Sequence, residues 1–153
     1  MADGVFNIAK GRVRGYTDQV GVGNAALVVV LLKSAGIEAD DALNNHDTLA
    51  AILAAANDEA DFTNYARKVV TSVTPTVDDT ANDLDLVIGN QEWTSAGGAS
   101  NNTLAKILVC FDPDTTGGTD SAIVPLTYHD FAVTTDGSNL TAEEPANGFF
   151  GAS

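Results

Sequence analysis

The stretch Thr103–Asp112, TLAKILVCFD, decides the fold expected for this chain. Taken with a period of two, both of its faces are apolar, and Lys106 is the one polar interruption. A strand that is apolar on both faces has to be covered on both faces. Turn residues bracket the stretch at 97–98 and again at 113–118. The pattern therefore predicts a central strand in a layered β structure.

Two further segments are the strongest strand candidates outside this stretch. Residues 25–32 contain three consecutive valines, whose stiffness at χ1 favours a strand over a helix. Residues 122–131 also follow a strand pattern, but Pro125 lacks the N–H that a central strand needs. We therefore expect this second segment to lie at a sheet edge or to contain a bulge.

Shorter signals complete the expected secondary structure. Asp136 and Gly137 are typical of a two-residue hairpin turn, so strands are expected on both sides of them. One short helix is expected between 47 and 56, with Asp47 as its cap and an alanine-rich apolar stripe. The two phenylalanines of the tail GFFGAS are expected to pack onto the body.

The spacing of these segments predicts the fold class. Roughly seven or eight short strands with regular turn signals are typical of a sandwich or barrel. The expected class is mainly β with one short helix (α+β), a β-sandwich or barrel-like domain with an extended N-terminal arm. Glycines at 4, 11 and 15 disfavour a helix in that arm. The expected domains are an arm over residues 1–24 and a single β-rich domain over residues 25–153.

The charge distribution bears on the kind of partner. The net charge is −14, with seven basic residues against 21 acidic ones, which argues against nucleic acid as a partner. Residues 1–33 are nevertheless slightly basic, while the remainder is strongly acidic. Such a segment is suited to docking on an acidic surface, including another copy of the chain. The alternative is that the acidic surface only keeps the protein soluble.

The sequence contains no signal for a membrane or a cofactor. The longest apolar run, 25–32, is much shorter than the roughly 20 residues of a membrane span, and the N-terminus lacks a signal-peptide pattern. We therefore expect a soluble protein made in the cytoplasm. Cys110 is expected to be a small buried hydrophobe, and the glycines near the N-terminus lack the features of a nucleotide-binding loop.

Candidate sites for chemistry are weak. Residues 112–120 resemble the first half of a Ca²⁺ loop, but Ile123 stands where a bidentate glutamate is needed. The preferred interpretation is a turn in which aspartates bond their own backbone. His46 and His129 lack the spacing of a metal site, and no nucleophile is placed beside a base. We expect no metal, no cofactor and no enzymatic activity.

Several motifs together resemble a known group of proteins. They are FTNYARK (62–68), VDDT (77–80), WTSAGG (93–98), NNTLAKILVCFDPDTTGGTDS (101–121), PLTYHDF (125–131), TTDGSNLT (134–141), the closing GFF, FNIAKGRV and LKSAGIEAD. The chain resembles small structural proteins of tailed bacteriophages over most of its length. The resemblance implies a virion component, foremost a capsid decoration (cement or head) protein, assembled in the host cytoplasm. A tail or connector role is the alternative.

A decoration protein needs a surface that attaches it to its shell. The implied partner is the major capsid protein, and self-association, for instance as a trimer at capsid threefold positions, follows from lattice symmetry. Aromatic residues and arginine dominate interface energetics. The predicted attachment residues are Phe6, Ile8, Arg12, Arg14 and Tyr16. The alternative for these residues is that they pack on their own domain.

Two rival classes of function are also considered. A carbohydrate-binding or receptor-binding module would use Trp93 and Tyr128 as a platform for a sugar. A small hydrolase is the other class, and the absence of a nucleophile–base motif argues against it.

Overall fold

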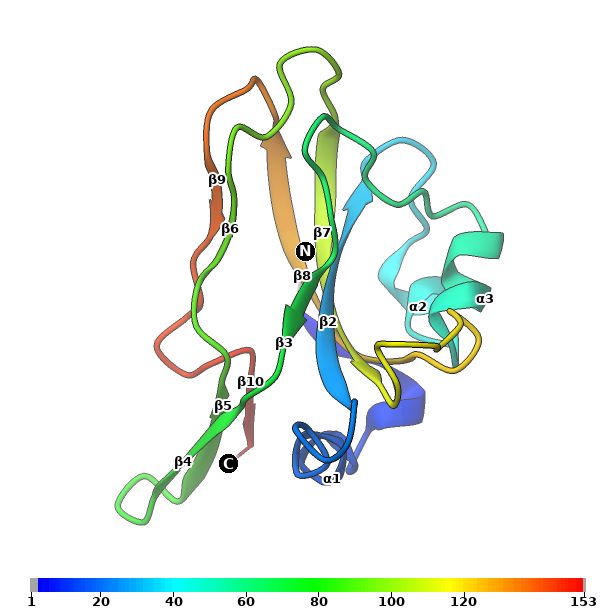
Figure 1. Ribbon diagram of the computed structural model, residues 1–153. Helices are drawn as coiled ribbons and strands as arrows, with labels where there is room; N and C mark the ends of the chain where they lie inside the picture. Colours follow the sequence, from blue (N-terminus) through cyan, green and yellow to red (C-terminus); the bar gives the residue numbers. More distant parts are fainter. Residues whose placement is uncertain (1–2, 153) are drawn as a thin grey trace.

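The chain is organised around β7 (Thr103–Asp112), the central strand of a five-stranded antiparallel sheet, in a computed structural model that describes residues 3–152 (Figure 1). The strand order is β1-β8-β7-β2-β3. The other strands are β1 (Gly4–Val5), β2 (Ala26–Lys33), β3 (Lys68–Val70) and β8 (Val124–Thr134). The expected central strand is confirmed, and β2 confirms the strand expected over residues 25–32. Both strands are buried along most of their length because both faces of the sheet are covered.

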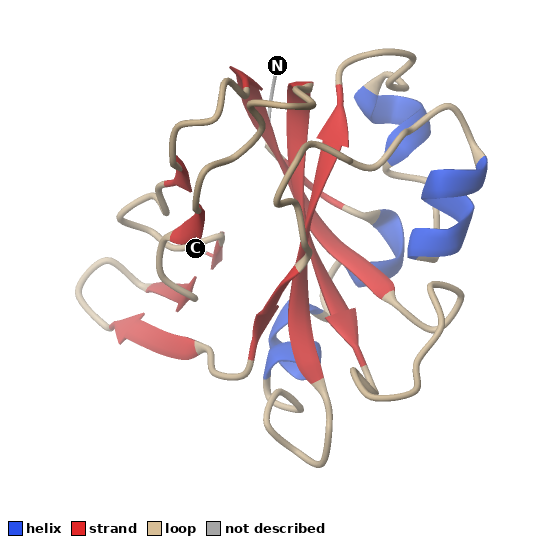
Figure 2. Cartoon of the chain, turned by 45° about the horizontal axis from the view of Figure 1, so that its top comes forward, coloured by secondary structure: helices blue, strands red, loops and turns tan. Residues whose placement is uncertain are grey.

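Short helical segments cover one face of this sheet (Figure 2). They are η1 (Asn7–Ala9), α2 (Asp40–Leu43) and α3 (Leu49–Ala54). Leu43, Leu49 and Ile52 from this layer pack in one cluster with Leu108 and Cys110 of β7. Cys110 is completely buried, as expected for a small hydrophobe.

Two smaller sheets cover the opposite face. One has the order β10-β5-β4 and the other pairs β6 with β9. The bounds are β4 (Thr74–Asp78), β5 (Asp83–Val87), β6 (Gln91–Trp93), β9 (Leu140–Ala142) and β10 (Phe150–Ala152). Leu86, Trp93 and Phe149 from this layer belong to a second core cluster that includes Val109 of β7. The fold is thus mainly β with open sheets, and the phenylalanine tail packs onto the body as expected.

The helices differ from the expectation of a single one. Among residues 3–152 there are three short α-helices, the third being α1 (Val13–Thr17). Gly15 lies inside α1, so the expectation that glycines exclude a helix here is wrong; Tyr16 packs this helix against Phe111 of β7. In α3 the capping residue is Thr48, whose hydroxyl accepts from the N–H of Ala51 at 3.1 Å, rather than Asp47. No helix within 3–152 is long and apolar enough to cross a membrane.

The segment around Asp136 and Gly137 does not form a hairpin. β8 ends at Thr134, and β9 pairs with β6 instead of returning along β8. The carboxylate of Asp136 accepts the N–H of Ser138 at 2.9 Å, and this turn carries the chain from one layer to the other. By contrast, of the two outcomes expected at Pro125, a sheet edge or a bulge, the structure shows the bulge, because the register between β7 and β8 shifts where Pro125 lies opposite Cys110.

The N-terminal residues lie on the domain. β1 pairs with β8 at the edge of the large sheet, and the N–H of Phe6 donates to the carbonyl of Leu126 at 3.0 Å. The Phe6 ring meets Tyr128 edge-on, with 5.3 Å between the ring centroids. A side chain at Gly4 would collide with the Tyr128 ring, so this close strand approach requires glycine.

Candidate attachment surface

The five predicted attachment residues fall into two environments. Phe6 is completely buried in the helix-side core, so its ring is not available to a partner, and the prediction is corrected at this position. Ile8 is half-buried against the same core. Arg12 and Arg14 are exposed, and Tyr16 is half-buried. The part of the predicted surface that is open to a partner is therefore carried by α1 and the residues just before it.

A shallow hollow of about 330 Å³ lies beside α1. It is lined by Arg12, Tyr16 and Gln19 together with Gly11 and Gly15. The two glycines leave open space where side chains would otherwise stand. The hollow therefore presents a guanidinium, a phenol and exposed backbone on one small surface.

The ion pairs determine which cations are free to act outside the domain. Four of the seven basic side chains are held by carboxylates within 3–152: Arg14 by Asp18, Lys33 by Asp61, Arg67 by Glu59 and Asp120, and Lys106 by Asp40 and Asp130. Lys68 lies over the ring of Trp93, 5.4 Å from its centroid. Within 3–152, Lys10 and Arg12 have no carboxylate partner and are exposed. The unpaired positive charge is thus concentrated at the start of α1, which sequence charge counting only located to residues 1–33.

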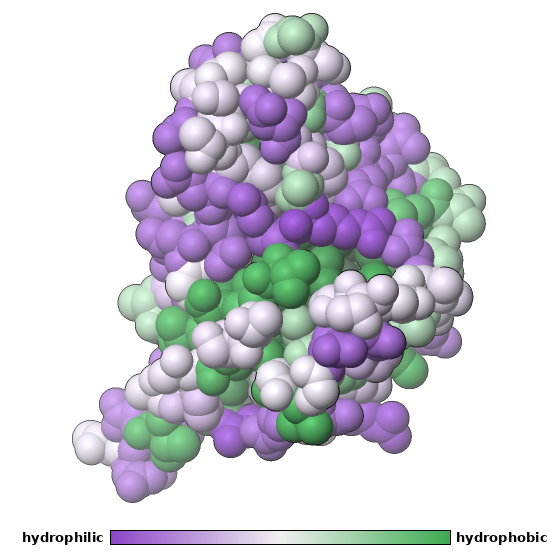
Figure 3. All heavy atoms as spheres, viewed as in Figure 1, coloured by the Kyte–Doolittle hydropathy of each residue, from purple (hydrophilic) through white to green (hydrophobic). Residues whose placement is uncertain are grey.

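Three exposed valines give the surface of the domain an apolar part that the sequence did not reveal. Val22, Val69 and Val77 are 67%, 55% and 67% exposed. Apolar side chains gather over β3 and along the chain toward β4 (Figure 3), both of which are edge strands. The loop that carries Val22 packs near this edge, since a side chain at Gly21 would meet the carbonyl of Thr71. Exposed apolar residues on an unpaired edge mark a surface suited to contact with another molecule.

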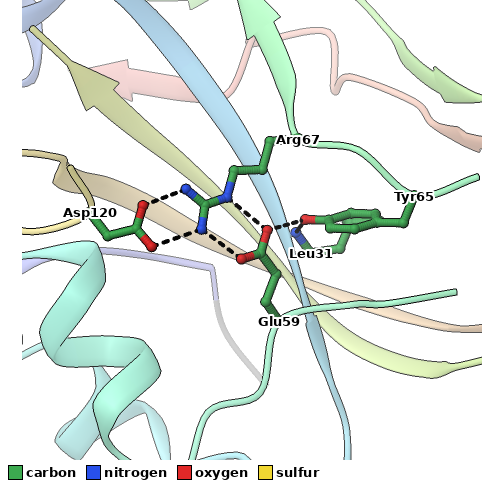
Figure 4. Close-up of polar contacts among 5 residues, drawn as sticks. All are labelled: Leu31, Glu59, Tyr65, Arg67 and Asp120. Carbon is green, nitrogen blue, oxygen red and sulfur yellow. Dashed lines mark hydrogen bonds and ion pairs between the residues drawn. The ribbon is translucent and has the colours of Figure 1, made fainter. Parts of the chain in front are cut away.

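A network of polar groups secures the chain leading into β3 (Figure 4). Arg67 donates to both oxygens of Glu59, at 2.8 and 2.7 Å, and to both oxygens of Asp120, at 2.6 and 3.0 Å. The hydroxyl of Tyr65 donates to Glu59 at 2.8 Å and accepts the N–H of Leu31 at 3.2 Å. These bonds join three segments that are far apart in the sequence.

The protonation states of this network follow from its contacts. Hydrogen bonds to Glu59 and Asp120 raise the pKa of Arg67, and burial together with the charge of Glu59 raises the pKa of Tyr65. The hydrogen bond from Arg67 lowers the pKa of Asp120. The guanidinium therefore remains charged and the phenol remains protonated. Because these groups bond one another, we interpret the network as a structural clamp.

The structure corrects the sugar-platform hypothesis and supports the turn interpretation of the acidic loop. Trp93 is 1% exposed and donates its indole N–H to the carbonyl of Ala66 at 2.8 Å, while Tyr128 is 6% exposed, so neither ring offers a platform. In the acidic loop, Asp112 accepts the N–H of Asp114 at 3.0 Å. Within 3–152, no group of three or more side chains is arranged to hold a metal ion.

The candidate nucleophile and bases are placed as follows. Complete burial raises the pKa of the Cys110 thiol, so it remains protonated and inaccessible. His46 bonds Glu38 at 2.8 Å, and His129 lies 3.2 Å from Asp3 and 3.0 Å from the hydroxyl of Thr127. Among residues 3–152, neither histidine forms a hydrogen bond with the cysteine.

Comparison of the chain with family models, with curated proteins and with solved structures gave no match.

Proposed function

We propose that this chain is a structural protein of a bacteriophage virion, a capsid decoration protein that binds the outer surface of the major capsid lattice. Support comes from the resemblance of its motifs to small phage structural proteins, together with the charge arrangement on its surface. A β-rich domain whose core is closed on both faces of a central sheet suits a role that depends on shape and stability.

The attachment surface that we propose consists of Lys10, Arg12, Arg14 and Tyr16 with the hollow beside α1. The observation that carries it is the position of Lys10 and Arg12, exposed cations without an acidic partner in 3–152, on a chain of net charge −14. Such a local excess of positive charge favours contact with an acidic surface, either a patch on the shell or the acidic surface of another copy of the chain. Exposed charge pairs are screened by salt, so attachment should weaken as salt rises.

The proposal includes a finer description of the fold and assembly. The large sheet and the smaller sheets facing it would form a β-sandwich, and residues 1–24 would act as the arm that contacts the lattice. Copies would associate as homo-oligomers, for instance trimers, because a lattice presents its binding sites in symmetric groups.

The test is rebinding of the purified protein to capsids that lack it. Deleting the N-terminal residues would also remove Phe6, Ala9 and Val13 from the core, so point substitutions are the cleaner experiment. Arg12→Glu is expected to weaken rebinding by about tenfold or more, because it places a carboxylate against an acidic patch.

Lys33→Glu is the control for this experiment. It makes the same charge change at a side chain that pairs with the exposed Asp61, outside α1. This variant should rebind nearly as well as the wild type. Unchanged rebinding of a folded Arg12→Glu variant would refute the proposed surface, and a particle that contains no copy of this chain would refute the proposed function.

A further inference from the structure

A small cavity of about 150 Å³ opens between the five-stranded sheet and the layer of smaller sheets. Val29, Ile107 and Val109 of β2 and β7 form its floor. Ile88 and Phe149 line it from the covering layer. These walls are apolar, so a hydrocarbon group that enters would displace water from hydrocarbon surface.

The mouth of this cavity is acidic. Asp3, Asp130, Glu143 and Glu144 all line it. Asp130 accepts from the buried Lys106 at 2.8 Å, Asp3 lies against His129, and Glu144 accepts the N–H of Ile88 at 2.8 Å. Glu143 is exposed and has no hydrogen bond or ion pair within 3–152. Among residues 3–152, these four carboxylates line the mouth and the ammonium group of Lys106 bonds one of them, Asp130, so the negative charges outnumber the positive ones there.

We propose that this cavity binds a small apolar group that carries a positive charge, with the hydrocarbon inside and the cation at the mouth. A cavity of about 150 Å³ holds a group of about the size of benzene. The carboxylates would attract an amine or a guanidinium and repel an anion of the same size. Two sources share this chemistry: a free organic amine, and a lysine or arginine side chain on another polypeptide.

This inference goes beyond the proposed attachment. The cavity lies between the sheet layers, while the attachment surface is carried by α1, and the residues lining the two sites are different. A failure of one proposal therefore leaves the other standing.

The test is a titration followed by amide chemical shifts in nuclear magnetic resonance spectra. Benzylamine is expected to bind with a dissociation constant in about the millimolar range and to shift the amides of Ile88, Ile107 and Phe149. Benzoate, which has a ring of the same size and the opposite charge, is expected not to bind. A blocked Gly-Arg-Gly peptide distinguishes the sources: tighter binding than benzylamine points to a polypeptide, and weaker binding points to a free amine.

Two variants locate the site. Glu143→Gln removes one charge from the mouth and is expected to weaken benzylamine binding about two- to fivefold. Asp79→Asn is the matched control, because it removes one exposed carboxylate from the loop between β4 and β5 and should leave binding unchanged. Ile107→Trp fills the cavity and should abolish binding. Equal binding of benzoate, or shifts confined to residues outside the cavity, would overturn the inference.

Discussion

Replacement of Arg67 by methionine tests whether the polar clamp stabilises the fold. Methionine keeps most of the aliphatic length of the side chain and removes the guanidinium. Glu59 then loses both bonds from Arg67 and retains the hydroxyl of Tyr65, while Asp120 loses its two bonds from the same group. The chain before β3 and the loop that contains Asp120 are no longer joined through this side chain.

The expected loss of stability follows from the exposure of the three partners. The side chains of Arg67, Glu59 and Asp120 are 26%, 19% and 37% exposed. Breaking a fully buried ion pair lowers the free energy of unfolding by about 3–5 kcal/mol, and breaking an exposed one by about 0–1 kcal/mol. Asp120 is open enough to regain water, whereas Glu59 is nearly enclosed. We therefore expect an intermediate loss of about 2–3 kcal/mol.

Thermal and urea unfolding measure this loss. A loss of about 2–3 kcal/mol lowers Tm by about 5–10 °C in a chain of this size. Arg14→Met is the control, because it also removes a guanidinium, but from an exposed pair with Asp18. It should change stability by less than about 0.5 kcal/mol. Arg67→Lys keeps the charge but cannot form both bidentate contacts, so its stability should lie between those of Arg67→Met and Arg14→Met.

The pH dependence gives a second readout. The pKa of Asp120 is lowered in the folded protein. The ionised Asp120 therefore adds to the free energy of unfolding above the ordinary carboxyl pKa, and this stabilisation is lost as the pH falls through the lowered value. The difference in the free energy of unfolding between wild type and Arg67→Met should be largest at neutral pH and should become smaller below about pH 4. If the free energies of unfolding of Arg67→Met and Arg14→Met are equal within error at neutral pH, the clamp interpretation is refuted.

Three further outcomes follow from the structure. Lys106→Met should lower the free energy of unfolding by about 1–3 kcal/mol at pH 7, because it leaves Asp40 and Asp130 side by side. The hydrogen bond from Lys106 lowers the pKa of Asp130, so this loss of stability, measured by urea unfolding, should become smaller below about pH 4. An equal loss at both pH values would contradict this account. Gly148→Ala should lower Tm more than Gly89→Ala. Both glycines have a positive φ, but only a side chain at Gly148 would collide with the backbone of Leu86. Equal decreases in Tm would rule out this collision as the cause. Millimolar calcium should leave Tm unchanged, because the aspartates of the 112–120 loop bond the backbone and Arg67; a rise in Tm would reinstate the calcium site.

Part of the candidate surface was predictable from sequence and part was not. The excess of basic residues near the N-terminus is visible in the sequence, and so are Arg12 and Tyr16 as interface residue types. The sequence left open whether Phe6 faces a partner or packs on its own domain, since its contact with Tyr128 joins residues far apart in the chain. The exposed valines beside the edge strands were missed for the same reason, because only the sheet order shows which strands have an open edge.

The sequence by itself determined the central strand and its neighbour β2, and it limited the Pro125 segment to a sheet edge or a bulge, because alternation, β-branched residues and a missing N–H act locally. Only the tertiary structure decided that the chain after β8 crosses to another layer, and that Lys106 is buried between two aspartates. It also decided which cations remain free, since whether a charge is paired depends on side chains brought together from distant parts of the chain. Local pattern specifies a strand, but long-range packing selects its partners.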